Sequence, residues 1–143
     1  MQPEPVQAEA IKTEKIKQTA LKVLKALGNP DAELSLLICS DREMAGYNEN
    51  YLGRPGPTNV IAFPMQEGEC SDINPHLLGD VVISADTARR EAAETGISFA
   101  RRFDELLVHG ILHLFAYDHE KSDAEELRME KKSEELLKLI YSE

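Results

Sequence analysis

The sequence lacks the features that mark membrane-spanning, secreted and disulfide-stabilised proteins. Its longest mainly apolar stretch, Leu106 to Ala116, has eleven residues and contains two histidines, whereas a membrane-spanning helix needs about 20 apolar residues. The N-terminus carries glutamate where a signal peptide needs lysine or arginine. There are only two cysteines, Cys39 and Cys70, and we expect both to be free thiols. These absences predict a cytoplasmic protein without a membrane span.

Positive charge is also scarce. Sixteen lysines and arginines face 26 aspartates and glutamates, so the formal net charge is -10. A chain of this charge repels polyanions, and any RNA or DNA must therefore be contacted through a local basic patch. The length of 143 residues and the hydrophobic content of 42% are those of an ordinary globular protein. We predict a single compact domain over residues 1–143.

Helical and strand patterns alternate along the chain. In order, we expect a helix at 6–27, a strand at 33–40, a short helix at 41–50, strands at 59–63 and 78–84, and helices at 86–95, 98–115 and from 122 onward. The expected N-terminal caps are Asp41, Asp86, Ser98 and Ser122. Two of the strands can pair as a hairpin. This order predicts an α/β fold with α+β layers, in which a small mixed sheet packs with about five helices.

Three of the four histidines, His109, His113 and His119, lie within eleven residues. His109 and His113 are four positions apart on a predicted helix, so their rings project from one face and can share a cation. His119 cannot reach that cation from an unbroken helix, so we expect the helix to end near Ala116 and the chain to turn back. This spacing favours a metal site over hydrogen-bonded histidines on a buried helix.

Three imidazoles leave one position of a tetrahedral zinc ion open to water, as in catalytic rather than structural sites. We therefore predict one Zn²⁺ per chain, although imidazole also suits other divalent transition metals. Asp118 directly precedes the third histidine, where its carboxylate can accept a proton from the bound water or orient an imidazole. Asp118 can equally be a solvent-exposed acid in a turn.

A metallopeptidase is the second interpretation of this spacing. Metzincin proteases share the pattern H-x-x-x-H-x-x-x-x-x-H, but a glutamate follows their first histidine as the general base and a glycine follows later. This chain has Gly110 at the glutamate position and Ala116 at the glycine position. Without that general base, the interpretation as a peptidase is weaker.

The segment HGILHLFAYDHE resembles the signature HGxLHLxGYDH of the YbeY family. Members of this family are bacterial metal-dependent endoribonucleases and ribosomal RNA maturation factors. Two more segments match in the family's order: Asn48 and Tyr51 followed by PTNVIAFP at 57–64, and LLGDVVIS at 77–84. The resemblance implies an α/β fold, a zinc ion held by the three motif histidines, and cleavage of single-stranded RNA. It also implies roles in maturing the 3′ end of small-subunit (16S) ribosomal RNA and in ribosome quality control, with the ribosome or its proteins as partners.

One departure from the family concerns an arginine that commonly follows the tyrosine of N-x-x-Y. This chain has Leu52 at that position and Arg54 two residues later. Our hypothesis is that Arg54 substitutes for the family's arginine and stabilises negative charge in the transition state. The alternative is a surface arginine without a catalytic duty. Because of Leu52, a noncatalytic ribosome-assembly factor with a structural metal remains a third interpretation.

Candidate substrate contacts lie outside the histidine motif. Arg89 and Arg90, like Arg101 and Arg102, form basic pairs near predicted helix starts, where they can contact phosphates. Asn59 opens a strand and can contact the substrate or simply form a rigid turn. The net charge predicts weak non-specific RNA binding that falls steeply with salt.

Overall fold

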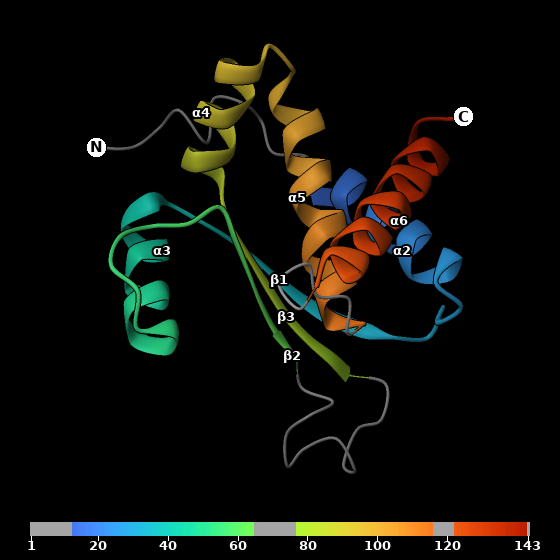
Figure 1. Cartoon of the computed structure of the whole chain (residues 1–143), viewed down its shortest axis with the longest axis horizontal. Helices are drawn as coiled ribbons and strands as arrows, with labels where there is room; N and C mark the ends of the chain where they lie inside the picture. Colours follow the sequence, from blue (N-terminus) through green and yellow to red (C-terminus); the bar gives the residue numbers. More distant parts are fainter. Residues whose placement is uncertain (1–12, 65–76, 116–121, 143) are drawn as a thin grey trace.

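Three strands form one mixed sheet in the computed structural model, which describes residues 13–64, 77–115 and 122–142. The strands are β1 (Glu33–Cys39), β2 (Val60–Pro64) and β3 (Leu77–Ser84), in the order β1-β3-β2. The central strand β3 runs parallel to β1 and antiparallel to β2 (Figure 1). The small mixed sheet predicted from the sequence is confirmed, and two of the three strands pair antiparallel as expected.

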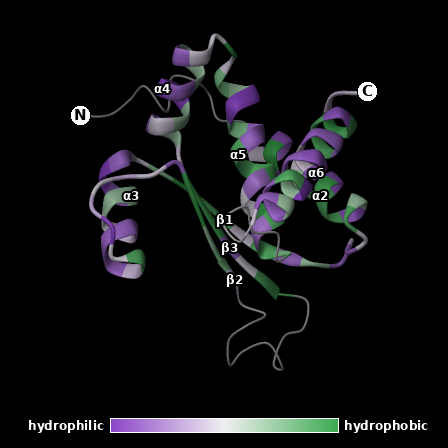
Figure 2. Ribbon diagram, viewed as in Figure 1, coloured by the Kyte–Doolittle hydropathy of each residue, from purple (hydrophilic) through white to green (hydrophobic). Residues whose placement is uncertain are grey.

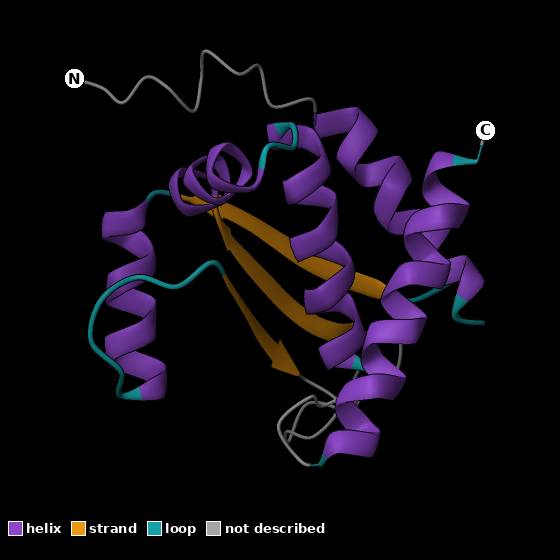
Figure 3. Cartoon of the chain, turned by 45° about the horizontal axis from the view of Figure 1, so that its top comes forward, coloured by secondary structure: helices purple, strands orange, loops and turns teal. Residues whose placement is uncertain are grey.

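Helices cover both faces of this sheet. The described residues contain five α-helices: α2 (Thr13–Ala26), α3 (Asp41–Tyr47), α4 (Ala85–Thr95), α5 (Phe99–Leu114) and α6 (Asp123–Tyr141). Helices α2, α5 and α6 lie on one side of the sheet and α3 lies on the other, while α4 follows β3 and contacts α5 (Figure 3). The predicted number of helices and their order along the chain are confirmed.

Strand alternation explains why the core has two parts. On β2, Val60 and Ala62 join the main core under α5, whereas Ile61 and Phe63 join a smaller core with Met44 of α3. Successive residues of a strand point to opposite faces, so one apolar strand serves both layers. The strands are accordingly among the most uniformly hydrophobic elements (Figure 2). One face of edge strand β2 therefore packs on the α5 side of the sheet, and its other face packs on the α3 side.

Two helix caps differ from the sequence prediction. Ser40, not Asp41, caps α3: its hydroxyl accepts a hydrogen bond from the Glu43 N–H at 3.2 Å, and the Glu43 carboxylate accepts one from the Ser40 N–H at 3.0 Å. Ser84, not Asp86, caps α4. In both places an extended serine at or just after the end of the strand precedes the helix and takes the capping position, so the aspartate falls into the first turn.

Other boundaries agree closely with the sequence prediction. Ser98 and Ser122 cap α5 and α6 as predicted. The short helix is the exception, because the α-helix ends at Tyr47 and continues as a π-helical turn, η1 (Asn48–Leu52). Residues 6–12 of the predicted first helix lie outside the described residues, as does Cys70. None of the described helices is both long and apolar enough to cross a bilayer.

Helix α6 buries Leu136 and Leu137 against the core, whereas Leu127 is 51% exposed. The buried residue in that half of the helix is Met129, and two positions along a helix correspond to a rotation of about 200°. Leu127 therefore points away from the core.

A polar contact joins α5 to α6 within this otherwise apolar interface. The Tyr141 hydroxyl donates a hydrogen bond to the carboxylate of Asp104, which is buried. Burial raises the pKa of Asp104, although the hydrogen bond from Tyr141 and the nearby Lys15 and Arg101 oppose the shift. Burial likewise raises the pKa of Tyr141. The pair fixes the position of the C-terminal helix on α5 by a directional bond.

Candidate metal centre

Helix α5 carries the first two histidines of the motif. The Ser98 hydroxyl accepts a hydrogen bond from the Arg101 N–H at 3.0 Å at its start, and the helix ends at Leu114, one residue before the end of the helix predicted at 98–115. Most of its length is buried between the sheet and the other helices. His109 and His113 lie in its last two turns, where the partial negative charge of a helix C-terminus favours a cation.

The two imidazoles converge. Their ring centroids are 4.7 Å apart, and Nε2 of His113 lies 3.1 Å from Nε2 of His109. Two nitrogens at 2.0–2.1 Å from one tetrahedral zinc ion lie ~3.3–3.4 Å apart, so the observed separation is close to that of a shared metal ion. Both rings are partly exposed, which gives an ion access to the nitrogens. In the structure the two nitrogens form a hydrogen bond between the rings at this distance, and the same spacing fits two ligands of one zinc ion.

The remaining predicted members of the centre, His119 and Asp118, lie outside the described residues, as does Ala116. Within 13–64, 77–115 and 122–142, no third histidine, cysteine, aspartate or glutamate completes a metal-binding group with the pair. The three-histidine set and the role of Asp118 therefore stay predictions.

Gly110, between the two histidines, packs directly on the sheet. A Cβ atom added to it would lie 2.7 Å from Cγ1 of Val81 and 3.2 Å from Cγ2 of Val60. Val81 is fully buried in the central strand, so its side chain has little freedom to move. A glutamate here, where metzincin proteases carry their general base, would be driven into β2 and β3 rather than toward the metal. The geometry thus opposes the peptidase interpretation.

Arg54 stands in the loop that follows η1. Asn48 is 5% exposed; its side-chain amide donates to the Gly56 carbonyl at 2.8 Å, and its backbone carbonyl accepts a hydrogen bond from the Arg54 N–H at 3.2 Å. Gly53 closes the turn with φ of 67°, a left-handed conformation that glycine adopts without strain. The backbone beneath Arg54 is therefore held in place while its side chain remains exposed.

The three predicted substrate contacts lie around the start of α4 and are engaged within the protein. The Arg90 guanidinium forms an ion pair with Asp41 at 2.6 Å. The Asn59 amide donates to the Glu91 carboxylate at 3.2 Å. Arg89 lies over the Phe99 ring, 5.0 Å from its centroid. Their role in substrate binding stays a prediction, because no ligand contact tests it.

Asp41 is the centre of a polar network that links β3, α3 and α4. Its carboxylate accepts hydrogen bonds from Ser84 at 2.7 Å, from Thr87 and from Arg90. Partial burial alone would raise the pKa of Asp41, but these hydrogen bonds and the Arg90 charge outweigh it and lower the pKa. Arg90 thus serves this junction, which could not be foreseen from its sequence neighbours.

The second predicted basic pair is also neutralised. Arg102 pairs with Glu91 at 2.9 Å and with Glu105 at 2.7 Å, and Arg101 pairs with Glu105 at 3.2 Å. Nearby carboxylates therefore offset much of the positive charge that we expected to contact substrate phosphates. Glu91 lies on the preceding helix, whereas Glu105 lies one helical turn from Arg101 and Arg102. Only the one-turn spacing can be recognised in the sequence.

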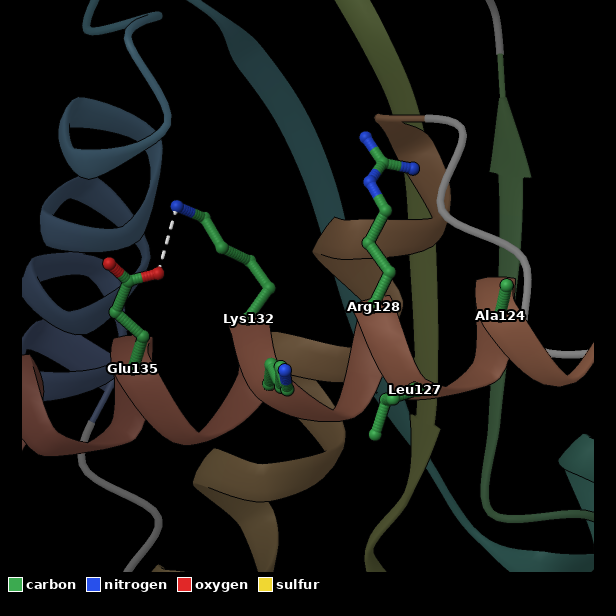
Figure 4. A pocket seen from close by; sticks show the side chains of 6 residues that line it. Ala124, Leu127, Arg128, Lys132 and Glu135 are labelled. Atoms are coloured by element: carbon green, nitrogen blue, oxygen red, sulfur yellow. Dashed lines mark ion pairs between the residues drawn. The ribbon is translucent and has the colours of Figure 1, made fainter.

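Two of the hollows among the described residues are lined by neither His109 nor His113. One, of about 400 Å³, lies along α6 and is lined by Ala124, Leu127, Arg128, Lys131, Lys132 and Glu135. Figure 4 shows Arg128 and Lys132 on one side of the helix and Leu127 on the other, with Lys132 paired to Glu135 at 3.0 Å. The other, of about 420 Å³, is a mainly apolar groove between α2 and β1.

Comparison with known proteins agrees with the motif pattern. The family model described as Endoribonuclease YbeY matches residues 4–141. The chain is 51% identical over 131 residues to Endoribonuclease YbeY of Geobacter sulfurreducens, covering 91% of this chain and 87% of that protein. It is 43% identical over 132 residues to the protein of that name from Aquifex aeolicus, covering 92% and 83%.

A solved structure agrees with the fold. The solution structure of a Thermotoga maritima protein matches with a TM-score of 0.61 and 23% identity, covering 99% of this chain and 86% of that one. At this identity the match supports the α/β architecture alone.

Proposed function

The chain belongs to the endoribonuclease YbeY family, and from this premise we propose that it is a zinc-dependent endoribonuclease that cleaves single-stranded RNA. Its proposed tasks are maturation of the 3′ end of small-subunit ribosomal RNA and ribosome quality control in the cytoplasm. The observation that carries the metal-dependent part is the 3.1 Å approach of the His109 and His113 Nε2 atoms.

His109, His113 and His119 would hold the metal ion. Held there, the ion would supply a Lewis acid for a phosphoryl oxygen and would activate water at neutral pH. For their part, His109 and His113 would bind the ion through neutral imidazole nitrogens. Helix α5, packed tightly through Gly110, keeps the two ligands at a fixed spacing.

Arg54 has the chemistry to bind a substrate phosphate. Its guanidinium presents planar donors that match phosphate oxygens, and its backbone is held by Asn48. We propose that this contact stabilises negative charge as the phosphodiester is cleaved, in place of the arginine absent at Leu52. Arg54→Ala should then reduce RNA cleavage about 100-fold or more, as loss of a charge-stabilising donor does in other enzymes. Unchanged cleavage and RNA binding would refute this role.

Metal binding can be tested without any activity assay. Zinc at 100 times its Kd should raise the free energy of unfolding by about 2.7 kcal/mol, measured by urea denaturation. His113→Ala should abolish this rise and the zinc content of the purified protein. Ser98→Ala is the matched control: it removes the cap of the same helix and costs about 1 kcal/mol, but it leaves the zinc response intact. Equal zinc responses in both variants would contradict the proposed ligand set.

Activity then separates the alternatives. We expect the zinc-loaded protein to cleave single-stranded RNA, to lose this activity when a chelator is added, and to leave casein intact. Digestion of casein but not RNA would support the peptidase. Zinc retention without turnover of either substrate would support the noncatalytic assembly factor.

A further inference from the structure

Tyr51 is an unusually exposed aromatic residue. Its side chain is 67% exposed, the highest value among the large hydrophobic side chains that stand out on the described surface. A single exposed apolar residue is common in soluble proteins and by itself indicates no function. What distinguishes Tyr51 is that its ring is also held in a defined orientation.

Two neighbouring rings orient Tyr51. The Tyr47 ring stacks on it with centroids 6.2 Å apart and an interplanar angle of 23°, and the Phe63 ring meets it edge-on at 5.6 Å and 74°. Both distances lie in the 4.5–7 Å range of favourable aromatic pairs. Because Tyr47 belongs to α3 and Phe63 to β2, the Tyr51 ring is fixed between two elements that pack on each other.

The backbone under the ring is ordered by its own contacts. Tyr51 lies in the π-helical turn η1, and such turns are frequent at functional sites. Asn48 at the start of this turn joins it to the following loop through Gly56 and Arg54. An exposed planar ring on a held backbone loses little conformational freedom when a ligand stacks on it.

The same loop supplies a cation. Within the described part of the chain, no ion pair involves Arg54, in contrast to Arg90 and Arg102. Glu49 on the same turn is also exposed and opposes a purely electrostatic attraction. A ligand that combines a flat apolar face with an adjacent negative charge fits this surface better than an anion alone.

We propose that Tyr51, supported by Tyr47 and Phe63, is a stacking platform for an unpaired base of single-stranded RNA, while Arg54 contacts a neighbouring phosphate. This rests on the proposed function for the identity of the ligand. Aromatic stacking with an adjacent basic side chain is a general way to hold single strands without reading their sequence. Duplex RNA hides its base faces and should not use the platform.

The position of the platform predicts how it acts. Phe63 lies on the α3 face of β2, whereas Val60, which packs near Gly110, lies on the α5 face. The platform and Gly110 therefore lie against opposite faces of edge strand β2. Because Arg54 follows Tyr51 in the same loop, the stacked base should be the one that adjoins the phosphate contacted by Arg54.

The first test measures binding of labelled single-stranded RNA of about 12 nucleotides, within the ~4–16 nucleotides typical of single-strand sites, by fluorescence anisotropy. Tyr51→Ala removes the stacking contact with one base and should therefore raise the Kd about 5- to 150-fold. Tyr51→Phe keeps the ring face and should recover most of the affinity. Leu127→Ala, at another exposed apolar residue, should bind like the wild type.

A second test reports stacking directly. The chain has no tryptophan, so Tyr51→Trp introduces a single tryptophan whose emission should be quenched by single-stranded RNA but not by duplex RNA. Leu127→Trp should show no quenching. Thermal unfolding of each variant checks that the fold is intact. An unchanged Kd for Tyr51→Ala together with no quenching of Tyr51→Trp would overturn the inference and would point to another role for the ring, such as protein contact.

These outcomes separate the inference from the proposed function. RNA binding and zinc-dependent cleavage with no effect of Tyr51→Ala would refute the platform alone. Binding that depends on Tyr51, in a zinc-loaded protein that does not cleave, would refute the nuclease and keep the platform. A wild-type protein that binds no single-stranded RNA would refute both.

Discussion

Replacing Gly110 by alanine tests the close packing that positions the candidate metal centre. In an unhindered helix, glycine to alanine stabilises by about 0.8–1.0 kcal/mol. At Gly110 the new Cβ would meet Val81 Cγ1 at 2.7 Å and Val60 Cγ2 at 3.2 Å. Both are β-branched strand residues with few alternative rotamers, and overpacking of a core costs about 1–3 kcal/mol.

The cost of the clash should exceed the gain in helix propensity. We expect Gly110→Ala to lower the free energy of unfolding by about 1–2 kcal/mol, measured by urea denaturation with far-UV circular dichroism and an unchanged m-value. Gly46→Ala is the matched control, because Gly46 also lies in a helix but has nothing within 4 Å of the added Cβ. This control should stabilise the protein by about 0.5–1 kcal/mol.

A double variant locates the cause. If Val81 is responsible, Val81→Ala should reduce the cost of Gly110→Ala, with an interaction energy of about 1 kcal/mol in a double-mutant cycle. If Gly110→Ala instead stabilises the protein as much as Gly46→Ala does, α5 is not packed against β3 as closely as the structure has it. The steric reason for rejecting a peptidase would then be lost as well.

Three further predictions concern ionisable side chains. Asp41 has a pKa below its ordinary 3.8, so the folded state binds fewer protons than the unfolded state. Asp41→Asn should therefore lower the free energy of unfolding by about 2 kcal/mol at neutral pH, measured by urea denaturation. The loss should become smaller as the pH falls through the lowered pKa. Burial of Cys39, with nearby acids, raises its pKa to about 12, so in Cys70→Ser the remaining thiol should resist alkylation until the protein is unfolded. Tyr141→Phe removes the donor to buried Asp104 and should cost about 1–3 kcal/mol; since the pKa of Asp104 is raised, this cost should be larger above that pKa, where the carboxylate is charged, and a pH-independent cost would contradict it.

Local sequence signals predicted most of the secondary structure. The strand before Asp41 and the helices that begin after Ser98 and Ser122 agree with the structure because apolar periodicity and capping residues act over a few neighbouring positions. The errors arose where two capping residues compete: the serine at or just after the strand end, Ser84 or Ser40, comes first and takes the cap. The π-helical turn also gave no sequence signal, because its backbone is set by Asn48 and the loop it holds.

Long-range partners could not be read from the sequence. Arg90 and Arg102 were predicted to be available for phosphates. In the structure Arg90 pairs with Asp41 and Arg102 pairs with Glu91, and these pairs form only when the sheet and helices pack together. The steric need for Gly110 is equally invisible in the motif, since it depends on strands that pack across the core. The exposure of Tyr51 and its contact with Phe63 depend on the same assembly.

The sequence by itself determined the order of helices and strands, the family and the four-residue spacing of His109 and His113, because each depends on residues that are close along the chain or on motifs that can be read directly. Only the tertiary structure decided which charges are neutralised, which glycine has no room for a side chain and which tyrosine remains exposed on a supported ring. Those properties arise from contacts between residues far apart in the chain, and such contacts exist only once the strands and helices pack together.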